Sequence, residues 1–344
     1  MKDIITLLMP RICSFKGNRF SKNNTGRLFK LLLLGTMGIL FWGGIFAVSL
    51  RVLGYFKEIA ELGDILSCKL LSMVLLTFFF LLVFSSILTT LSKLYLSRDL
   101  PLVHSLPVPS YKIFIARWIE STLDSSWMVI VYTIPVFISY GIVYRAGFIF
   151  YGNMFLVILI LSVISAGISV VLIMIVVNFV PANRIKNIFI FIGLSFFLIL
   201  FFAFRFLRPE RLVDPEVFSN VLFYLKSLKS PAPLYLPSTW VFDSMKATLS
   251  GHIMEGMFHS VLSLSWAGVM VCSAIIISNY YYFNGVSKTQ TAQVRLFKYS
   301  YSGRRFPIFL PRFCRALMSK EIRTFFRDQT QWSQLFLIAS LVVI

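Results

Sequence analysis

The sequence predicts an all-α, polytopic membrane helical bundle with six complete spans and the start of a seventh. The chain has 344 residues, of which 58% are hydrophobic and only 14% are charged, and its mean hydropathy is +0.81. Hydrophobic runs of about 20 residues recur along it, and a helix of that length crosses the ~30 Å hydrocarbon core of a bilayer. The predicted spans are 31–53, 66–91, 126–144, 154–180, 187–207 and 257–283. A further run begins at Ser333 and stops at Ile344, so we expect these residues to be a fragment or a truncated product of a longer protein.

Basic residues are unevenly divided among the segments that separate these spans, and the net charge is +19. One set of segments carries 23 Lys and Arg residues and the alternate set carries seven. The first set is 1–30, 92–125, 181–186 and 284–332; the second is 54–63, 145–153 and 208–256. Because loops rich in Lys and Arg stay in the cytoplasm, we expect a multi-pass protein of the cell membrane with a cytoplasmic amino terminus. The asymmetry accounts for the charge without a nucleic-acid partner and places the basic loops against anionic membrane lipid.

The chain therefore divides into four predicted parts. Residues 1–30 form a cytoplasmic basic segment, and residues 31–283 form a six-helix transmembrane domain with a cytoplasmic loop at 92–125 and an external loop at 208–256. Residues 284–332 form a cytoplasmic basic linker, and residues 333–344 start a further span. Small residues, which let helix backbones approach closely, mark the expected helix contacts in the first and fourth spans. They are Gly35, Gly38, Gly43 and Gly44 in the first span, and Ser162, Ser165, Gly167 and Ser169 in the fourth.

The sequence lacks the side chains that an intramembrane enzyme needs, and we expect no catalytic residue, no metal and no cofactor. The central portions of the predicted spans contain no Asp or Glu, whereas ionisable groups inside a membrane are usually functional. No phosphate loop of the form GxxxxGK followed by Ser or Thr occurs. His252, Glu255 and His259 would share one face of a helix, as a zinc set can. We favour a solvated interfacial face for them, because they lie at the mouth of the sixth span.

The stretch SRDLPLVHSLPVPSYKIF, residues 97–114, separates two hydrophobic runs. Its prolines at 101, 107 and 109 fix φ and lack an amide hydrogen, so 100–109 is predicted to be an extended, rigid connector. Ser110 is predicted to be the N-cap of a helix over 111–123. Tyr111, Phe114, Ile115, Trp118 and Ile119 would cluster on one side of that helix, with Lys112, Arg117, Glu120 and Asp124 largely on the other. A stiff arm before an aromatic-faced helix suits the transfer of force from a soluble partner to the bundle; a helix that rests on lipid is the alternative.

A second informative stretch is SKEIRTFFRD, residues 319–328. On a helix, Met318, Ile322, Phe325 and Phe326 fall on one side, opposite Lys320, Arg323, Arg327 and Asp328. A helix divided in this way beside a span is predicted to lie in the cytoplasmic membrane interface; a juxtamembrane helix that only sets orientation is the alternative. The patterns MPRIC at 9–13 and LPRFC at 310–314 also resemble each other. If they mark a repeat, the protein was built as two membrane halves, as many transporters are.

The segment LSRDLPLVHSLPVPSYKIFIARW, residues 96–118, resembles the cytoplasmic loop after the second span in membrane subunits of type-2 ABC exporters. It is most similar to the branch of large bacterial ABC exporters. The segment KEIRTFFRD, residues 320–328, is similar to the amphipathic elbow helix that the same family places before the first span of each half. Gln329 stands where that family usually has a proline.

The resemblance implies a permease of the bacterial inner membrane that moves a substrate with ATP hydrolysed by a separate ATP-binding cassette subunit. Membrane lipid, and either a second permease half or a second copy of the chain, would be its other partners. The coupling loop to the ATPase would contain Asp99, Leu100, Pro101, Ser105, Leu106, Pro107 and Val108, with Tyr111, Phe114 and Trp118 on the adjoining helix face. The elbow would contain Lys320, Glu321, Ile322, Arg323, Phe325, Phe326, Arg327 and Asp328.

Two other function classes stay open from the sequence. A secondary transporter or channel would need no ATPase partner, but it usually has ionisable residues or broken helices near the bilayer midplane. Pro135 is the one such break near the centre of a predicted span. A membrane-embedded enzyme or assembly scaffold is the other class, and the lack of reactive side chains argues against an enzyme.

Overall fold

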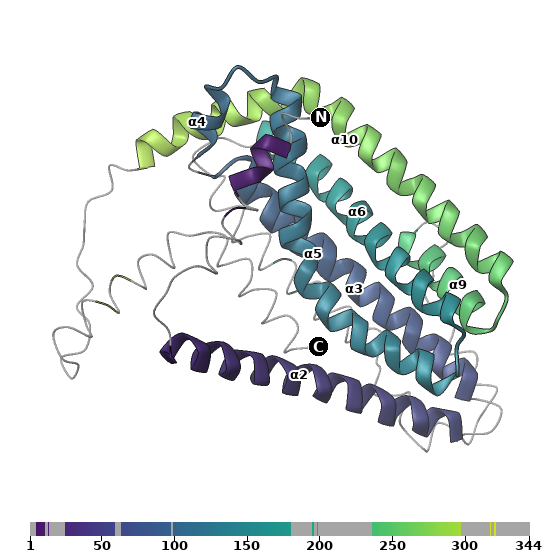
Figure 1. Ribbon diagram of the computed structural model, residues 1–344. Coiled ribbons are helices and arrows are strands. Elements are labelled where there is room, and N and C mark those ends of the chain that lie inside the picture. Colours follow the sequence, from purple (N-terminus) through teal and green to yellow (C-terminus); the bar gives the residue numbers. More distant parts are fainter. Residues whose placement is uncertain are drawn as a thin grey trace.

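The computed structural model describes residues 5–10, 13, 25–58, 63–97, 99–179, 195, 198, 236–296, 317 and 320. Within these residues the chain is all-α, as the sequence predicts (Figure 1). The helices are α2 (Thr25–Glu58), α3 (Gly63–Leu94), α4 (Leu100–His104), α5 (Ser110–Val143), α6 (Phe148–Phe179), α9 (Pro237–Leu249) and α10 (Ile253–Leu296). Helices α3, α5, α6 and α10 run side by side along the bundle, and α2 lies across its lower side in the view.

Four helices in the described part of the chain are long and apolar enough to cross a membrane: α2, α3, α6 and α10. Helix α5 adds a fifth candidate if its two halves, Ser110–Trp127 and Val129–Val143, cross together despite a bend of 47° between them. These spans indicate a membrane protein. The expectation of six complete spans is therefore met by four or five. Of the remaining predicted run, 187–207, only residues 195 and 198 are described, and the incomplete run 333–344 lies outside the described residues.

Helix α6 lies at the centre of the bundle, between α3 and α10. Its sequence is apolar all round, which suits a helix that neighbours cover on several sides. The expected close contacts of its small residues are confirmed. Ser162, Ser165 and Ser169 are buried, and a Cβ atom on Gly167 would lie 2.9 Å from the Cβ atom of Met270 in α10.

The expected close contacts of the glycines in the first span are wrong for the described structure. A Cβ atom on any of these glycines would meet no described atom within 4 Å; they are Gly35, Gly38, Gly43 and Gly44. Helix α2 instead contacts α5 and α3 through larger groups. Phe41 packs edge-on against Tyr132, with ring centroids 5.5 Å apart, and Leu53 is fully buried. The glycines of α2 therefore mark no close contact with another helix among the described residues.

The predicted external loop 208–256 contains a helix that the sequence analysis missed. Helix α9 begins at Pro237, which suits the first helical turn because proline has no amide hydrogen to leave unpaired. It packs against α3, α6 and α10. The side chain of Asn153 on α6 donates from Nδ2 to Ser244 Oγ on α9 at 2.9 Å, and accepts at Oδ1 from Ser260 on α10 at 2.7 Å. We call this end of the bundle the α9 end.

Helix α10 is longer than the span predicted at 257–283. Its 44 residues run to Leu296, which at 1.5 Å per residue is about 66 Å and twice the thickness of a hydrocarbon core. The first part of the predicted linker 284–332 is therefore a continuation of this helix. Helix α2 likewise begins at Thr25 rather than at residue 31, within the predicted basic segment.

Candidate functional site

The candidate site is the end of the bundle at which α3 and α6 end and α5 begins, with α4 lying across it (Figure 1). We call it the α4 end. The chain leaves α3 at Leu94, forms the short helix α4, and enters α5 at Ser110. All ten residues predicted for the coupling loop and the adjoining face, from Asp99 to Trp118, lie here.

The predicted extended connector over 100–109 is only partly correct. Residues Leu100–His104 form a helical turn instead. Pro101 is compatible with it, because a missing amide hydrogen costs nothing in the first turn of a helix. The amide of Val103 donates to Asp99 O at 2.9 Å, which closes this turn. Pro109 has extended backbone angles, as predicted, and Pro109 rather than Ser110 is the N-cap of α5. The predicted helix over 111–123 is present, but as the beginning of a helix that continues to Val143.

The coupling-loop residues divide into an exposed set and a buried set. Asp99, Pro101, Ser105, Leu106, Pro107 and Tyr111 are exposed, and Val108 is half-buried. Leu102, which the sequence analysis did not single out, is 71% exposed. Leu100 is fully buried and anchors α4 to the bundle. The exposed set is therefore available to a partner, and partner binding by it stays a prediction.

Phe114 and Trp118 lie in the buried set, at 0% and 6% exposed. Their rings are stacked on each other with centroids 6.0 Å apart, and Trp118 Nε1 donates to Ala166 O of α6 at 3.3 Å. The aromatic side of the 111–123 helix was correctly placed, but it faces α6 and α10 at these two positions. In this conformation their side chains support the exposed residues instead of reaching a partner directly.

The charged side of the same helix forms an ion-pair network that the sequence analysis did not foresee. Arg117 on α5 pairs with Asp99, the N-cap of α4, and donates from Nη1 to Glu120 Oε2 at 2.9 Å. Lys93 at the end of α3 donates to Glu120 Oε1 at 2.7 Å and lies 3.1 Å from Asp124 Oδ2. The network therefore joins α4, α5 and α3.

The charges around α4 affect its two titratable residues. Burial by itself raises the pKa of Asp99, but hydrogen bonds from Ser97 and Arg117 outweigh that effect and hold the pKa below its ordinary value. Burial, and then the positive charge of Arg117, lower the pKa of His104 below its ordinary value. At neutral pH, Asp99 is therefore a carboxylate and His104 a neutral imidazole.

An aromatic cluster joins α4 to α10 beside this network. The ring of Tyr282, fully buried on α10, lies with its centroid 6.0 Å from that of Tyr95, 5.7 Å from that of His104 and 5.4 Å from that of Phe114. A Cβ atom on Gly285 would lie 2.7 Å from Tyr95 Cε1, so this position needs a glycine for α10 to pack this closely against Tyr95. Tyr95 Oη, Tyr282 Oη and His104 Nε2 are buried and have no hydrogen-bond partner among the described residues.

A family model described as "Putative ATP-binding cassette" matches residues 22–344 of the chain. The chain belongs to this family. The chain matches no curated protein and no solved structure. The family match covers the whole α4 end and all candidate spans, so the resemblance inferred from residues 96–118 is confirmed at the level of the ATP-binding cassette family.

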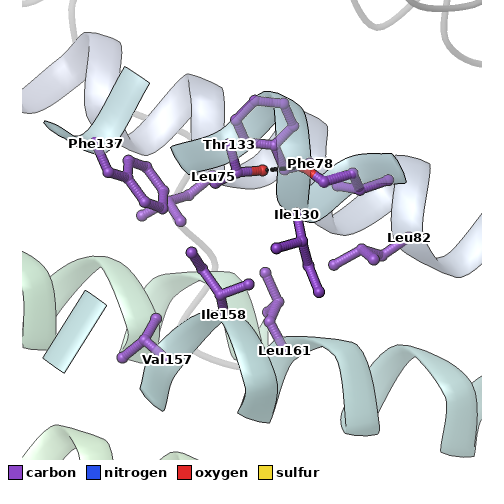
Figure 2. Close-up of a pocket in the computed structure, with 10 residues that line it drawn as sticks. Leu75, Phe78, Leu82, Ile130, Thr133, Phe137, Val157, Ile158 and Leu161 are labelled. Atoms are coloured by element: carbon purple, nitrogen blue, oxygen red, sulfur yellow. Dashed lines mark hydrogen bonds between the residues drawn. The ribbon is translucent and has the colours of Figure 1, made fainter. Parts of the chain in front are cut away.

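The family membership raises the question of a substrate site. One cavity among the described residues lies between α3, α5 and α6 and has a volume of about 10 Å³. Figure 2 shows side chains of α3 and α5 facing Ile158 and Leu161 of α6 across it. Thr133 is the one residue with a hydroxyl in its lining, and that hydroxyl donates to Val129 O at 2.6 Å. This space is no larger than one water molecule and is apolar, so it does not hold a substrate.

The remaining predicted sites are tested only in part. Among the described residues, no three His, Cys, Asp or Glu side chains lie close enough together to hold a metal ion, so the zinc alternative for His252, Glu255 and His259 gains no support. In the predicted elbow, Lys320 is helical and exposed. The other elbow residues lie outside the described residues; they are Glu321, Ile322, Arg323, Phe325, Phe326, Arg327 and Asp328.

Proposed function

We propose that the chain is the transmembrane permease component of an ABC exporter of the type-2 kind, and that it moves its substrate with ATP hydrolysed elsewhere. The family match supports the ABC assignment. The sequence has no phosphate loop, which supports placing ATP hydrolysis on a domain or subunit beyond these 344 residues. The observation that carries the proposal is α4 itself, a short helix that lies across one end of the bundle with apolar side chains exposed.

The surface proposed for the ATPase is smaller than the one the sequence indicates. Leu102, Leu106 and Tyr111 are exposed large side chains on or beside α4. Tyrosine is enriched among the residues that dominate the affinity of protein interfaces, and the two leucines add apolar area around Tyr111. Phe114 and Trp118 lie beneath them and contribute by holding α5 in place. Contact with α4 would therefore be transmitted to the bundle by the residues that the α4 end keeps buried.

The proposed topology keeps six spans and a cytoplasmic amino terminus. Asn153, near the start of α6, contacts the α9 end, whereas Asn178, near its end, donates to Tyr281 O of α10 at 3.2 Å. Helix α6 thus finishes at the opposite end of the bundle from α9. The proposed six-span topology takes the chain between them back across the membrane in the run 187–207, whose length suits a span. The excess of Lys and Arg supports a cytoplasmic α4 end, and residues 320–328 are proposed to lie in that interface as an elbow.

The proposal is tested by co-purification of an ATP-hydrolysing subunit with the full chain in detergent. Leu102→Asp combined with Leu106→Asp should abolish the co-purifying ATPase activity, because two charges would stand in the proposed interface. The control is Met254→Asp, which changes an apolar side chain that is 83% exposed at the α9 end and should leave the activity unchanged. An unaltered ATPase yield from the double variant would refute this docking surface. Transport by the chain with no ATPase bound would favour a secondary transporter.

A further inference from the structure

Helix α4 is held to the bundle by two contacts of different chemistry. At its start, Asp99 pairs with Arg117 of α5, and Arg117 also donates to Glu120 in the same helix. Ion pairs linked in a network with charge-assisted hydrogen bonds are firmer and more directional than isolated surface pairs. Because Glu120 continues the network to Lys93 of α3, this contact fixes α4 to α5 and α3 together.

The second contact joins the other end of α4 to α10. The ring of His104 lies 5.7 Å from that of Tyr282 and 6.2 Å from that of Phe283, measured between centroids. His104 Nε2 and Tyr282 Oη are buried there without a hydrogen-bond partner among the described residues. A buried polar atom without a partner weakens the packing around it. This contact is therefore the easier of the two to separate.

The two contacts lead to different parts of the bundle. Helix α5 packs mainly against α3 and α2, whereas α10 packs mainly against α6 and α9. Figure 1 shows α5 and α10 on opposite sides of α6, converging at the α4 end. A displacement of α4 must therefore move one of these sides more than the other.

We propose that Arg117 is a positioning residue that makes α4 and α5 one moving unit, and that the contact between His104 and Tyr282 is the one that opens when α4 is displaced. Only the source of the displacement, an ATPase that pulls on α4, rests on the proposed function. The pairing of Arg117 with Asp99 is a property of the chain alone. It selects α5 and α3, rather than α10, as the helices that follow α4.

The test measures distances between spin labels in the full chain, without an ATPase. The four native cysteines are replaced by alanine, and labels are placed at exposed positions: Leu102 on α4 with Leu123 on α5, and Leu102 with Tyr280 on α10. Asp99→Asn removes the ion pair between Arg117 and α4 and weakens the hydrogen bond from Ser97, so the 102–123 distribution should lose its single narrow peak. Glu120→Gln is the matched control: it makes the same carboxylate-to-amide change but leaves the α4 link, so that peak should stay narrow.

The aromatic contact is tested in the same labelled chains. His104→Ala should broaden the 102–280 distribution and leave the 102–123 distribution unchanged. Arg117→Lys, which keeps the charge but loses the forked donor, should give an intermediate 102–123 width. A narrow 102–123 peak in Asp99→Asn, or equal broadening of both distances in His104→Ala, would overturn the inference. Neither result would affect the co-purification test, so failure here and failure of the proposed function are told apart.

Discussion

At the α9 end, Asn153, Ser244 and Ser260 are joined by neutral hydrogen bonds: Ser244 Oγ donates to Ser260 Oγ at 2.6 Å, and the single hydroxyl hydrogen of Ser260 goes to Asn153 Oδ1. At the α4 end, the helices are joined by ion pairs centred on Arg117 and by the ring cluster around Tyr282. These three side chains are paired with one another, whereas Ser67 Oγ, Tyr144 Oη and His259 Nδ1, also toward that end, are buried without a hydrogen-bond partner among the described residues. The polar atoms of the ring cluster have no partner among the described residues.

The difference indicates that the two ends have different structural roles. A closed set of neutral hydrogen bonds has one good arrangement, and inside a membrane protein it fixes helix positions. At the α4 end, by contrast, no hydrogen bond among the described residues fixes the ring contact between His104 and Tyr282. The hydrogen-bonded set at the α9 end is therefore suited to hold α6, α9 and α10 in place, and the ring contact at the α4 end is suited to open.

The largest effect is expected from removing the ring that supports the α4 end. Trp118→Ala should lower the free energy of unfolding by about 3–5 kcal/mol, because a buried aromatic side chain leaves a cavity. Thermal unfolding in detergent micelles measures this. Trp127→Ala is the control, since Trp127 lies on the same helix and is 48% exposed, and it should change stability by only about 0.5 kcal/mol. Equal losses in both variants would mean that Trp118 is not part of a core.

At the α9 end, a smaller loss of stability is expected, and it comes from crowding instead of from a cavity. A Cβ atom on Gly256 would lie 2.5 Å from Thr248 Cγ2 and 3.3 Å from Ser244 O, so Gly256→Ala should cost about 1–3 kcal/mol. Gly268→Ala on the same helix meets no described atom within 4 Å. It should be neutral or stabilising, because alanine favours helix over glycine. A Gly256→Ala melting temperature equal to that of the wild type would show that the α9 end is not rigid.

Deleting one hydroxyl at each end compares the stability contribution of a hydrogen-bonded hydroxyl with that of a hydroxyl that has no partner among the described residues. Ser260→Ala removes the donor to Asn153 Oδ1 and should cost about 0.6–1.7 kcal/mol, the range for hydrogen bonds between membrane helices. Tyr282→Phe removes a hydroxyl that has no partner among the described residues, so it should leave stability unchanged or raise it slightly. The same unfolding measurement compares the two. A larger loss from Tyr282→Phe would reverse the comparison between the ends.

The smallest expected effect is a pH dependence of opposite sign at the two ends. The folded pKa of Asp99 is held low, so its stabilisation is present above the unfolded pKa of about 3.9 and is lost as pH falls through the folded value. Burial raises the pKa of Asp243 on α9, despite the nearby charges of His259 and Lys246. Its stabilisation is present below the unfolded pKa and is lost as pH rises through the folded value.

Replacing each acid by its amide measures these two contributions. Asp99→Asn should lower the melting temperature at about pH 7, and Asp243→Asn should raise it; both differences should shrink toward about pH 3. Scans of both variants and the wild type across that range provide the check. Differences of the same sign would show that one of the two environments has been assigned incorrectly.

The sequence predicted the spans well where burial in lipid or in the bundle depends on apolar side chains alone. The runs 66–91 and 154–180 correspond closely to α3 and α6. Helix α9 escaped prediction because its residues are mixed in polarity, and it is buried through hydroxyl and amide hydrogen bonds. No hydrophobic run marks a helix of that kind.

The candidate site shows the same limit at the level of single residues. Amphipathic spacing correctly placed Phe114 and Trp118 on one side of a helix, but periodicity does not identify what covers that side. Tyr282, which covers Phe114, lies about 170 residues away in the chain and carries no local signal of this contact. Glycine positions show the same limit. A glycine permits the close approach of another helix both at Gly167 in α6 and at Gly38 in α2, but a neighbouring helix lies that close only at Gly167.

The unbroken length of α10 has a mechanical consequence. From Ile253 to Leu296 the helix contains no proline, the commonest cause of a sharp kink. Figure 1 shows it bending where it passes the α4 end, so the part that runs along α6 works as a lever arm. Between Ile253 and Tyr282 the helix rises about 44 Å, so a tilt of about 10° about its first end displaces Tyr282 by about 8 Å. A small rocking at the α9 end is thus amplified at the α4 end, where Tyr282 stands one-third of the way back from the tip.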